Sequence, residues 1–158
     1  MVVPMIIERC NARHFDGWVR LRCLLWTDQT IEAHRKYAGA TIDRPENATV
    51  YIAREGDTVI GFAEATMRRD YVNGCSTSPV GFLEGLFVEK TYRGRGIARL
   101  LNDALEQWAA GFGCTEFASD VLLDNTVGQK AHEALGYKET ERVVFYAKRL
   151  VRRSSLIG

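Results

Sequence analysis

The stretch that decides the fold is a glycine-rich basic turn, Tyr92-Arg93-Gly94-Arg95-Gly96-Ile97-Ala98-Arg99. It follows an apolar run over residues 82–88 and opens a long amphipathic segment over residues 97–112. Gly94 and Gly96 let the backbone approach a ligand closely, and the free N–H groups of the following helix point at an anion. The three arginines of the turn can add charge-assisted hydrogen bonds. Strand, turn and helix together predict a site for a phosphorylated cofactor.

Strand-like and helix-like patterns alternate on both sides of this turn. Strands are predicted over residues 4–8, 49–54, 58–67, 80–88, 114–121 and 141–148, and helices over residues 11–25, 31–40, 97–112 and 124–135. This order predicts a single α/β domain over residues 1–150, with a mixed sheet (α+β) covered by helices on both faces, and a tail over residues 151–158. A polar loop over residues 68–79 is long enough to suggest a functional role.

Composition and charge exclude several classes of protein. A chain of 158 residues with 46% hydrophobic side chains can build one real core, and its net charge of +1 argues against a general nucleic-acid binder. No apolar run reaches the roughly 20 residues that span a bilayer, and the N-terminus lacks the pattern of a signal peptide. The cysteines form no C-x-x-C pair and the histidines are scattered. We expect a cytoplasmic protein with reduced thiols, no metal site, and no nucleic-acid or membrane partner.

The turn differs from the two common nucleotide-binding motifs. It is neither G-x-G-x-x-G nor G-x-x-x-x-G-K-[ST], and the strand before it is the fourth predicted strand rather than the first. Its pattern, Arg93-x-x-Gly96-x-Ala98, resembles the pyrophosphate signature [Q/R]-x-x-G-x-[G/A] of the GNAT superfamily of acyl-CoA-dependent N-acetyltransferases. The order of the elements, an asparagine-headed helix and a Gly-Tyr pair included, also follows the family over nearly the whole chain. The alternative is an arginine-rich helix start on a solvated surface.

The GNAT resemblance implies acetyl-CoA as co-substrate and a largely antiparallel sheet whose fourth and fifth strands splay around it. Gly85 suits the bulge at which those strands part. Backbone groups of the fourth strand would bind the pantetheine arm, amides of the turn would bind the pyrophosphate, and an asparagine at a helix start would touch the cofactor. These residues are Leu86, Phe87, Val88, Arg93, Gly94, Arg95, Gly96, Ile97, Ala98, Arg99 and Asn125.

Several further segments resemble one group of the superfamily, the aminoglycoside 6′-N-acetyltransferases, which inactivate antibiotics. They are residues 71–74, 82–85, 118–120 and 139–146. An aminoglycoside is a polycation, so its pocket should present carboxylates and an aromatic wall. The candidates are Trp26, Gln29, Tyr71, Glu84, Asp120 and Glu141. Each has a plainer interpretation as core, cap or solvated surface. Some relatives carry a histidine shortly after the tryptophan, where this chain has Thr27-Asp28-Gln29.

The resemblance implies direct attack of the acceptor amine in a ternary complex. Asp120 or Glu84 is the candidate base, and the residues alone do not choose between them. Tyr146 is a candidate for protonating the CoA thiolate, with a half-buried strand tyrosine as the alternative. A covalent route through Cys75 is weaker, because no histidine stands beside it in the sequence.

Rival functions remain at this point. They are a GNAT enzyme acting on a polyamine, a peptide N-terminus or another small amine, and a binder of acetyl-CoA or aminoglycoside without chemistry. Related enzymes are commonly dimers, so the resemblance also implies a homodimer.

Overall fold

The computed structural model describes residues 1–152, and its centre is a five-stranded sheet with the order β1-β2-β3-β4-β5. The strands are Met5–Arg9 (β1), Ala48–Glu55 (β2), Thr58–Arg68 (β3), Val80–Val88 (β4) and Phe117–Ser119 (β5). Strands β1 to β4 pair antiparallel with their neighbours, whereas β5 joins β4 in parallel. The mixed, mostly antiparallel sheet predicted from the sequence is therefore confirmed.

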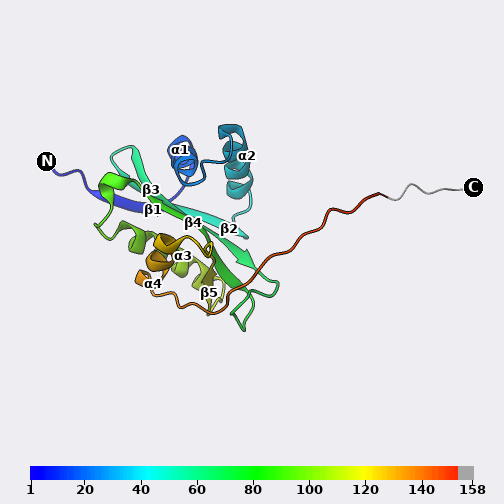
Figure 1. The fold of residues 1–158 in the computed structure, drawn as a ribbon. Helices are drawn as coiled ribbons and strands as arrows, with labels where there is room; N and C mark the ends of the chain where they lie inside the picture. Colours follow the sequence, from blue (N-terminus) through cyan, green and yellow to red (C-terminus); the bar gives the residue numbers. More distant parts are fainter. Residues whose placement is uncertain (153–158) are drawn as a thin grey trace, which may run out of the picture.

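Helices cover both faces of this sheet (Figure 1). The helices are Phe15–Leu25 (α1), Ile31–Ile42 (α2), Ile97–Gly111 (α3) and Thr126–Ala134 (α4). Helices α1 and α2 lie on one face, and α3 and α4 lie on the other. Each face has its own buried cluster: Trp18 packs with Phe62 under α1, and Leu101 packs with Ala63 under α3. Burial of apolar surface on both faces holds the layers together.

Local sequence explains where the helices begin. Asn11 accepts a hydrogen bond from the Arg13 amide at 2.9 Å, before the short 3-10 helix Ala12–His14 that leads into α1. Thr30 accepts one from the Ala33 amide at 3.1 Å and caps α2. Both side chains satisfy amides that a helix N-terminus otherwise leaves without a partner. Helix α3 has no such cap, a difference that matters for the site.

The sheet opens between β4 and β5. These strands pair only over Gly81–Leu83 and Phe117–Ser119. Within β4, Glu64 on β3 faces Gly85 while the next residue, Ala65, faces Leu83. Glu84 is therefore the extra residue of a β-bulge. The predicted splay after a bulge is confirmed, and the inserted residue is Glu84, one position before the glycine that the sequence suggested.

Two predicted strands differ from the structure. The fifth strand is short, Phe117–Ser119 rather than residues 114–121. The strand predicted over residues 141–148 is wrong for this structure, because residues 137–152 contain neither helix nor strand. A strand needs a neighbouring strand to bond its N–H and C=O groups, and no described residue pairs with this segment.

The C-terminal segment instead runs away from the body of the molecule (Figure 1). Of the tail predicted over residues 151–158, residues 153–158 lie outside the described part of the chain. In the described residues, no helix has the length and apolar character needed to cross a bilayer.

Candidate active site

The glycine-rich turn joins the end of β4 to α3 through a short 3-10 helix, Lys90–Tyr92. Gly94 and Gly96 adopt left-handed backbone angles, with φ of 79° and 77°. A side chain at either position would strain the backbone. A Cβ built at either position meets no atom within 4 Å, so the two glycines face open space rather than packed protein. The turn therefore keeps its backbone accessible to a ligand.

The first turn of α3 carries positive charge that nothing in it offsets. Gly96 precedes the helix without a side-chain cap, and the first turn holds no acidic residue. Within the described residues, the amides of residues 94–99 donate to no protein acceptor. Three arginines add to the positive end of the helix dipole, an arrangement that an anion stabilises. This backbone geometry suits the phosphate site that the sequence predicts.

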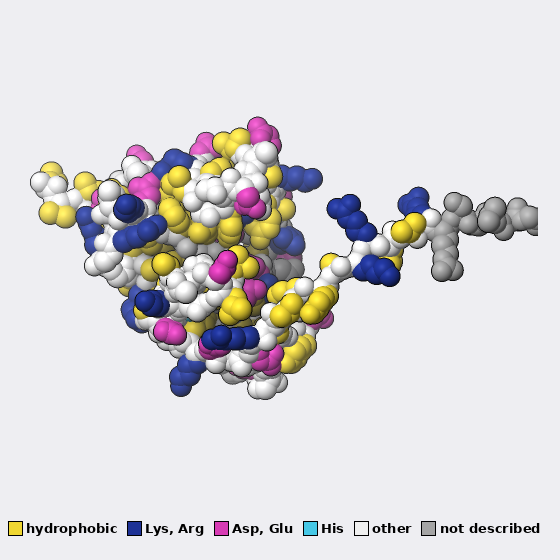
Figure 2. Space-filling view, viewed as in Figure 1, with side chains coloured by type: hydrophobic (Ala, Val, Ile, Leu, Met, Phe, Trp, Pro, Cys, Tyr) yellow, Lys and Arg dark blue, Asp and Glu magenta, His cyan; other side chains and the backbone are white. Residues whose placement is uncertain are grey.

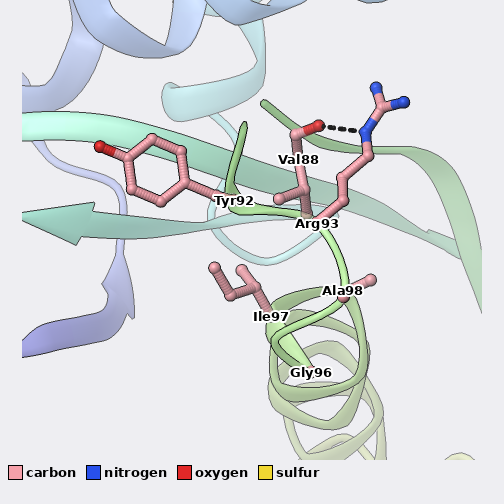
Figure 3. Close-up of a pocket in the computed structure, with 7 residues that line it drawn as sticks. Val88, Tyr92, Arg93, Gly96, Ile97 and Ala98 are labelled. Carbon is pink, nitrogen blue, oxygen red and sulfur yellow. Dashed lines mark hydrogen bonds between the residues drawn. The ribbon is translucent and has the colours of Figure 1, made fainter. Parts of the chain in front are cut away.

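A cavity of about 100 Å³ lies between the end of β4 and this turn (Figure 3). It is lined by Val88, Tyr92, Arg93, Gly94, Gly96, Ile97 and Ala98. Arg93 donates from Nε to the Val88 carbonyl oxygen at 2.8 Å, and its guanidinium lies 5.4 Å from the ring centre of Phe87. Arg93 thus fastens the turn to the end of β4. The other two arginines also contact protein: Arg95 lies near Glu55 and Arg99 donates to the Ala134 carbonyl oxygen.

The opening between β4 and β5 leads from this cradle toward the bulge. Leu86, Phe87 and Val88 lie on the part of β4 beyond its last pairing with β5. Their side chains range from half-buried to buried. A long, narrow ligand arm can lie along this stretch with its anionic end at the turn. The sequence predicts the pantetheine arm along these same residues.

The two candidate bases stand in different surroundings. Glu84 accepts hydrogen bonds from Thr66 Oγ1 and from Arg68 Nη2, the latter at 3.0 Å. Asp120 directly follows β5, is exposed, and its carboxylate bonds no group among residues 1–152. Glu84 is therefore already hydrogen-bonded and oriented, whereas the carboxylate of Asp120 remains free to meet a cationic amine. This difference in hydrogen bonding distinguishes the two candidate bases, between which the sequence did not choose.

Trp26 lies against the bulge. A Cβ at residue 85 would stand 2.4 Å from Cη2 of Trp26, so Gly85 is what lets the indole approach β4. The Arg22 guanidinium lies 4.5 Å from the Trp26 ring centre and forms an ion pair with Glu64. Trp26 is thus held from both sides, which fits an aromatic wall beside the acetyl group.

The Arg22–Glu64 pair behind this tryptophan is a feature that the sequence analysis missed. Arg22 and Glu64 are 4% and 2% exposed, and Trp18 Nε1 donates to Glu64 at 2.8 Å. Burial raises the pKa of Glu64, while the attraction and hydrogen bond of Arg22 lower it. The available signal was a charged residue on an otherwise apolar face of α1. That signal does not identify the partner, which lies on β3.

A serine–histidine pair stands where β4 and β5 part. His132 Nδ1 lies 2.7 Å from the Gly128 carbonyl oxygen, which only accepts, so this nitrogen carries the proton. In the neutral ring Nε2 then accepts from Ser119 Oγ, 2.7 Å away. Ser119 is the last residue of β5 and faces Leu83, the last paired residue of β4. Nothing in the sequence indicates that Ser119 on β5 contacts a histidine on α4.

Other predicted site residues lie apart from this centre. Asn125 caps α4 by accepting from the Gly128 amide at 2.9 Å, so its oxygen already serves the helix. Tyr71 is 76% exposed in the polar loop, and Gln29 is exposed between α1 and α2. Glu141 and Tyr146 lie on the extended C-terminal segment, where Tyr146 is 93% exposed. A single chain does not bring these last two residues to the site.

Metal chemistry finds no support in the described part of the chain. Residues 1–152 contain no cluster of three histidine, cysteine or acidic side chains that could hold an ion. All four cysteines are free. The polar groups described at the candidate site are backbone amides, arginines, carboxylates and the serine–histidine pair.

Comparison with known proteins agrees with this geometry. The family described as "Acetyltransferase (GNAT) family" matches residues 18–137. An aminoglycoside N(6')-acetyltransferase type 1 from Salmonella typhimurium (strain LT2) is 46% identical over 145 residues, covering 92% of this chain and 99% of the relative. The corresponding protein of Acinetobacter baumannii is 44% identical, also with 92% and 99% covered.

A solved structure shares the fold at similar identity. AAC(6')-Iy in complex with the bisubstrate analogue CoA-S-monomethyl-acetylneamine superposes with a TM-score of 0.88 at 44% identity, covering 93% of this chain and 99% of that one. The resemblance drawn from the turn and the acceptor segments is confirmed. The chain belongs to the GNAT acetyltransferases and, within them, to the family of aminoglycoside N(6')-acetyltransferases.

Proposed function

We propose that this chain transfers the acetyl group of acetyl-CoA to the 6′-amine of aminoglycoside antibiotics and so confers resistance to them. The observation that carries the proposal is the uncapped, arginine-rich start of α3 at one end of the β4–β5 opening, with a free carboxylate, Asp120, at the other. The first part suits a phosphorylated thioester and the second suits a cationic amine. Relatives of the same length carry that activity in their names.

The donor would bind along the opening. Amides of residues 94–99 would hold the pyrophosphate, and Leu86, Phe87 and Val88 would line the pantetheine arm. This direction places the thioester near the bulge at Glu84 and the end of β5. A relative solved with CoA supports the same co-substrate.

The acceptor would lie over Trp26 and between the two carboxylates. An aminoglycoside amine is mostly protonated at neutral pH, and only its free base attacks a carbonyl carbon. Asp120 is the better proton acceptor, since Glu84 is already bonded to Thr66 and Arg68. The nitrogen then attacks the thioester carbonyl, the C–S bond breaks, and the acetyl group passes directly to the amine. Glu84 contributes negative charge that orients the cation.

The departing thiolate needs a proton. Ser119 and His132 offer one from within the same chain, because they stand at the apex of the opening. Tyr146, the donor predicted from the sequence, is on the extended segment and reaches no site of its own chain. We assign the proton delivery to Ser119 and the imidazolium form of His132: Nε2 gives its proton to Ser119 Oγ while the hydroxyl passes its own proton to sulfur, which leaves the neutral ring with its remaining proton on Nδ1.

We also propose a cytoplasmic, homodimeric enzyme with its catalytic domain over residues 1–150. Acetyl-CoA is a cytoplasmic metabolite, and reduced thiols fit the four free cysteines.

Release of free thiol from acetyl-CoA across a panel of aminoglycosides tests this function. Compounds with a 6′-amine should release thiol, and their analogues with a 6′-hydroxyl should not. Equal turnover of the hydroxyl compounds would contradict the 6′ position. Thiol release with spermidine or a peptide alone would move the chain to another acceptor, and no release with any amine would leave a binder without chemistry.

A further inference from the structure

Two arginine–glutamate ion pairs lie on the face of the sheet that α1 covers. Arg22 pairs with Glu64, and Arg68 pairs with Glu84. Every second residue of β3 from Glu64 to Arg68 shares this face, because side chains alternate along a strand. The first pair is buried, whereas the side chains of Arg68 and Glu84 are 42% and 24% exposed. Ion pairs open to water contribute little to stability, so the second pair is the one that a ligand can disturb.

Arg68 contacts only one of the two carboxylate oxygens of Glu84. Its Nη2 donates to Oε1 at 3.0 Å, and the Thr66 hydroxyl donates to the same oxygen. No residue in the described part of the chain bonds Oε2. Oε2 is also not one of the buried polar atoms that lack a partner, so it is open to water. Glu84 therefore has one oxygen that the protein occupies and a second that can accept a hydrogen bond from a ligand.

An aromatic ring holds the Arg68 guanidinium beside Glu84. The guanidinium carbon lies 3.4 Å from the ring centre of Phe82. Phe82 belongs to a small buried cluster on β4 and the polar loop, and it is only 4% exposed. Planar guanidinium groups stack favourably on aromatic faces. This stack keeps a positive charge next to Glu84 even when the hydrogen bond from Arg68 to Oε1 is broken.

The charge of Arg68 matters because few negative charges at the candidate acceptor site are free. Leu83 pairs with Ser119, so the residues that follow them, Glu84 and Asp120, occupy neighbouring positions where the strands part. The Asp120 carboxylate is free among the described residues, whereas Arg68 offsets the charge of Glu84. Acidic and basic side chains are interspersed on the face shown in Figure 2, and the net charge is +1. Attraction of a polycation therefore depends on individual carboxylates rather than on a broad surface field.

We propose that Arg68 is a specificity-determining residue of the acceptor site, an internal cation that shares the Glu84 carboxylate with the acceptor. The inference rests on the proposed function, because the acceptor in question is an aminoglycoside. An ammonium group of the acceptor bonds Oε2 while Arg68 stays at Oε1, and the two positive charges repel each other across one carboxylate. The acceptor therefore binds more weakly than Glu84 and Asp120 alone would allow.

The same arrangement makes the site tolerant of a hydroxyl in place of that ammonium group. A hydroxyl also donates to Oε2, but it carries no charge for Arg68 to repel. Arg68 thus reduces the difference in affinity between two aminoglycosides that differ by one amine-for-hydroxyl exchange away from the reacting 6′ position. The acceptor site accepts a wider range of aminoglycosides at the expense of affinity for the most highly charged ones.

Calorimetric titration of an aminoglycoside into the protein saturated with CoA tests the proposal without catalysis. Arg68→Gln removes the internal cation and should lower the Kd for the aminoglycoside about fivefold, with no change in the affinity for CoA. Arg69→Gln is the matched control, because it removes the same charge at the next residue, whose guanidinium donates to Asn47. It should change the Kd less than about twofold. An unchanged or raised Kd in Arg68→Gln would overturn the proposal.

Two further substitutions separate the charge of Arg68 from its shape. Arg68→Lys keeps the charge and should keep the Kd within about twofold of the wild-type value. Arg68→Met keeps an apolar stem over Phe82 and should show the same gain in affinity as Arg68→Gln. The methionine variant also covers the case in which Arg68→Gln unfolds because Phe82 loses its cover. An equal gain in Arg68→Lys and Arg68→Met would contradict an effect of charge.

Matched pairs of aminoglycosides locate the ammonium group that shares Glu84. Each pair differs by one amine-for-hydroxyl exchange, and the panel contains one pair for each amine other than the 6′-amine. For one position, Arg68→Gln should widen the ratio of the two Kd values about fivefold, and Glu84→Gln should narrow the ratio for the same position. No widening for any pair, or responses to the two substitutions at different positions, would overturn the sharing of Glu84.

Thiol release by the wild-type chain separates this proposal from the proposed function. Release from acetyl-CoA with 6′-amines, together with an unchanged Kd in Arg68→Gln, would overturn the role of Arg68 alone. Wild-type protein that binds no aminoglycoside and releases no thiol would overturn both. Release in the wild type and tighter binding in Arg68→Gln is the result that we expect.

Discussion

The glycine-rich turn at residues 93–99 and the apolar segment at residues 141–150 are both short sequence patterns that predict a structure. Only the turn adopts its predicted structure within one chain. Everything the turn needs is local: two left-handed glycines and the first amides of α3. The segment needs a neighbouring strand, and none of the described residues supplies one. Local geometry follows from local sequence, whereas strand pairing depends on what else is present.

The same contrast divides the proposed site into a donor side and an acceptor side. The donor side, from Val88 to Arg99, is assembled and held in place by contacts such as that of Arg93 with the Val88 carbonyl. The acceptor side has Trp26, Glu84 and Asp120 in the folded body, but its remaining candidates lie on the exposed α1–α2 connection, the exposed polar loop and the extended segment. Variants on each side test whether the donor side and the acceptor side have separate roles.

Asp120→Asn should have the largest effect, a fall in kcat of about 1,000-fold, because the amide keeps the shape of the carboxylate but accepts no proton from the amine. The KM for acetyl-CoA should not change. Glu84→Gln is the matched comparison and should cost far less, since Thr66 and Arg68 already occupy its carboxylate. Steady-state kinetics with both substrates measures this. The reverse order of effects would make Glu84 the base.

Ala98→Glu should weaken acetyl-CoA binding by about 100-fold, because it puts a negative charge where the pyrophosphate would sit. The same charge favours the N-terminus of α3, so thermal stability should hold or rise. Ala98→Gln adds a side chain of equal size without charge and should cost much less. Calorimetric titration with CoA separates the two. Equal losses would mean that bulk, and not an anion site, explains the effect.

Much of the fold could be read from the sequence because its signals are periodic or local. The amphipathic helix α3 and the neighbouring strands β2 and β3 appear close to the expected residues. The shortness of β5 could not be read, because it depends on the distance between neighbouring strands. The strand predicted over residues 141–148 was wrong for this structure, because its residue types favour a strand but no described residue pairs with them.

The candidate site likewise contains parts that the sequence predicts and parts that it does not. The cofactor turn is contiguous in sequence, so one motif located it. The Arg22–Glu64 and Ser119–His132 pairs each join two elements that are far apart in the chain. The spacing of residues in the sequence does not predict such a contact, because the contact depends on how the helices pack on the sheet. Glu84 and Asp120 were found as residues, but their difference in bonding appeared only with their neighbours.

A double-mutant cycle on Ser119 and His132 tests whether these two residues of one chain deliver the proton to the CoA thiolate. Ser119→Ala and His132→Phe should each lower kcat about tenfold with little change in acetyl-CoA affinity. The double variant should be no slower than either single variant, because both belong to one proton path. Multiplicative losses would mean two independent roles. Normal turnover in both would leave Tyr146 of a partner subunit as the remaining proton donor.

Cys75→Ala should have the smallest effect, within about twofold of wild-type turnover, because nothing around the thiol favours its nucleophilic form. Burial raises the pKa of Cys75, and the charge of Glu116 raises it further. A raised pKa keeps the group as a thiol at neutral pH, whereas a covalent route needs the thiolate. Cys75, itself part of the polar loop, packs instead beside Val72 and Phe82. Trapping of an acetylated Cys75 after mixing with acetyl-CoA alone, or near-complete loss of turnover in Cys75→Ala, would replace direct transfer by a two-step mechanism. It would also shift the first chemical step from the donor side to the exposed loop.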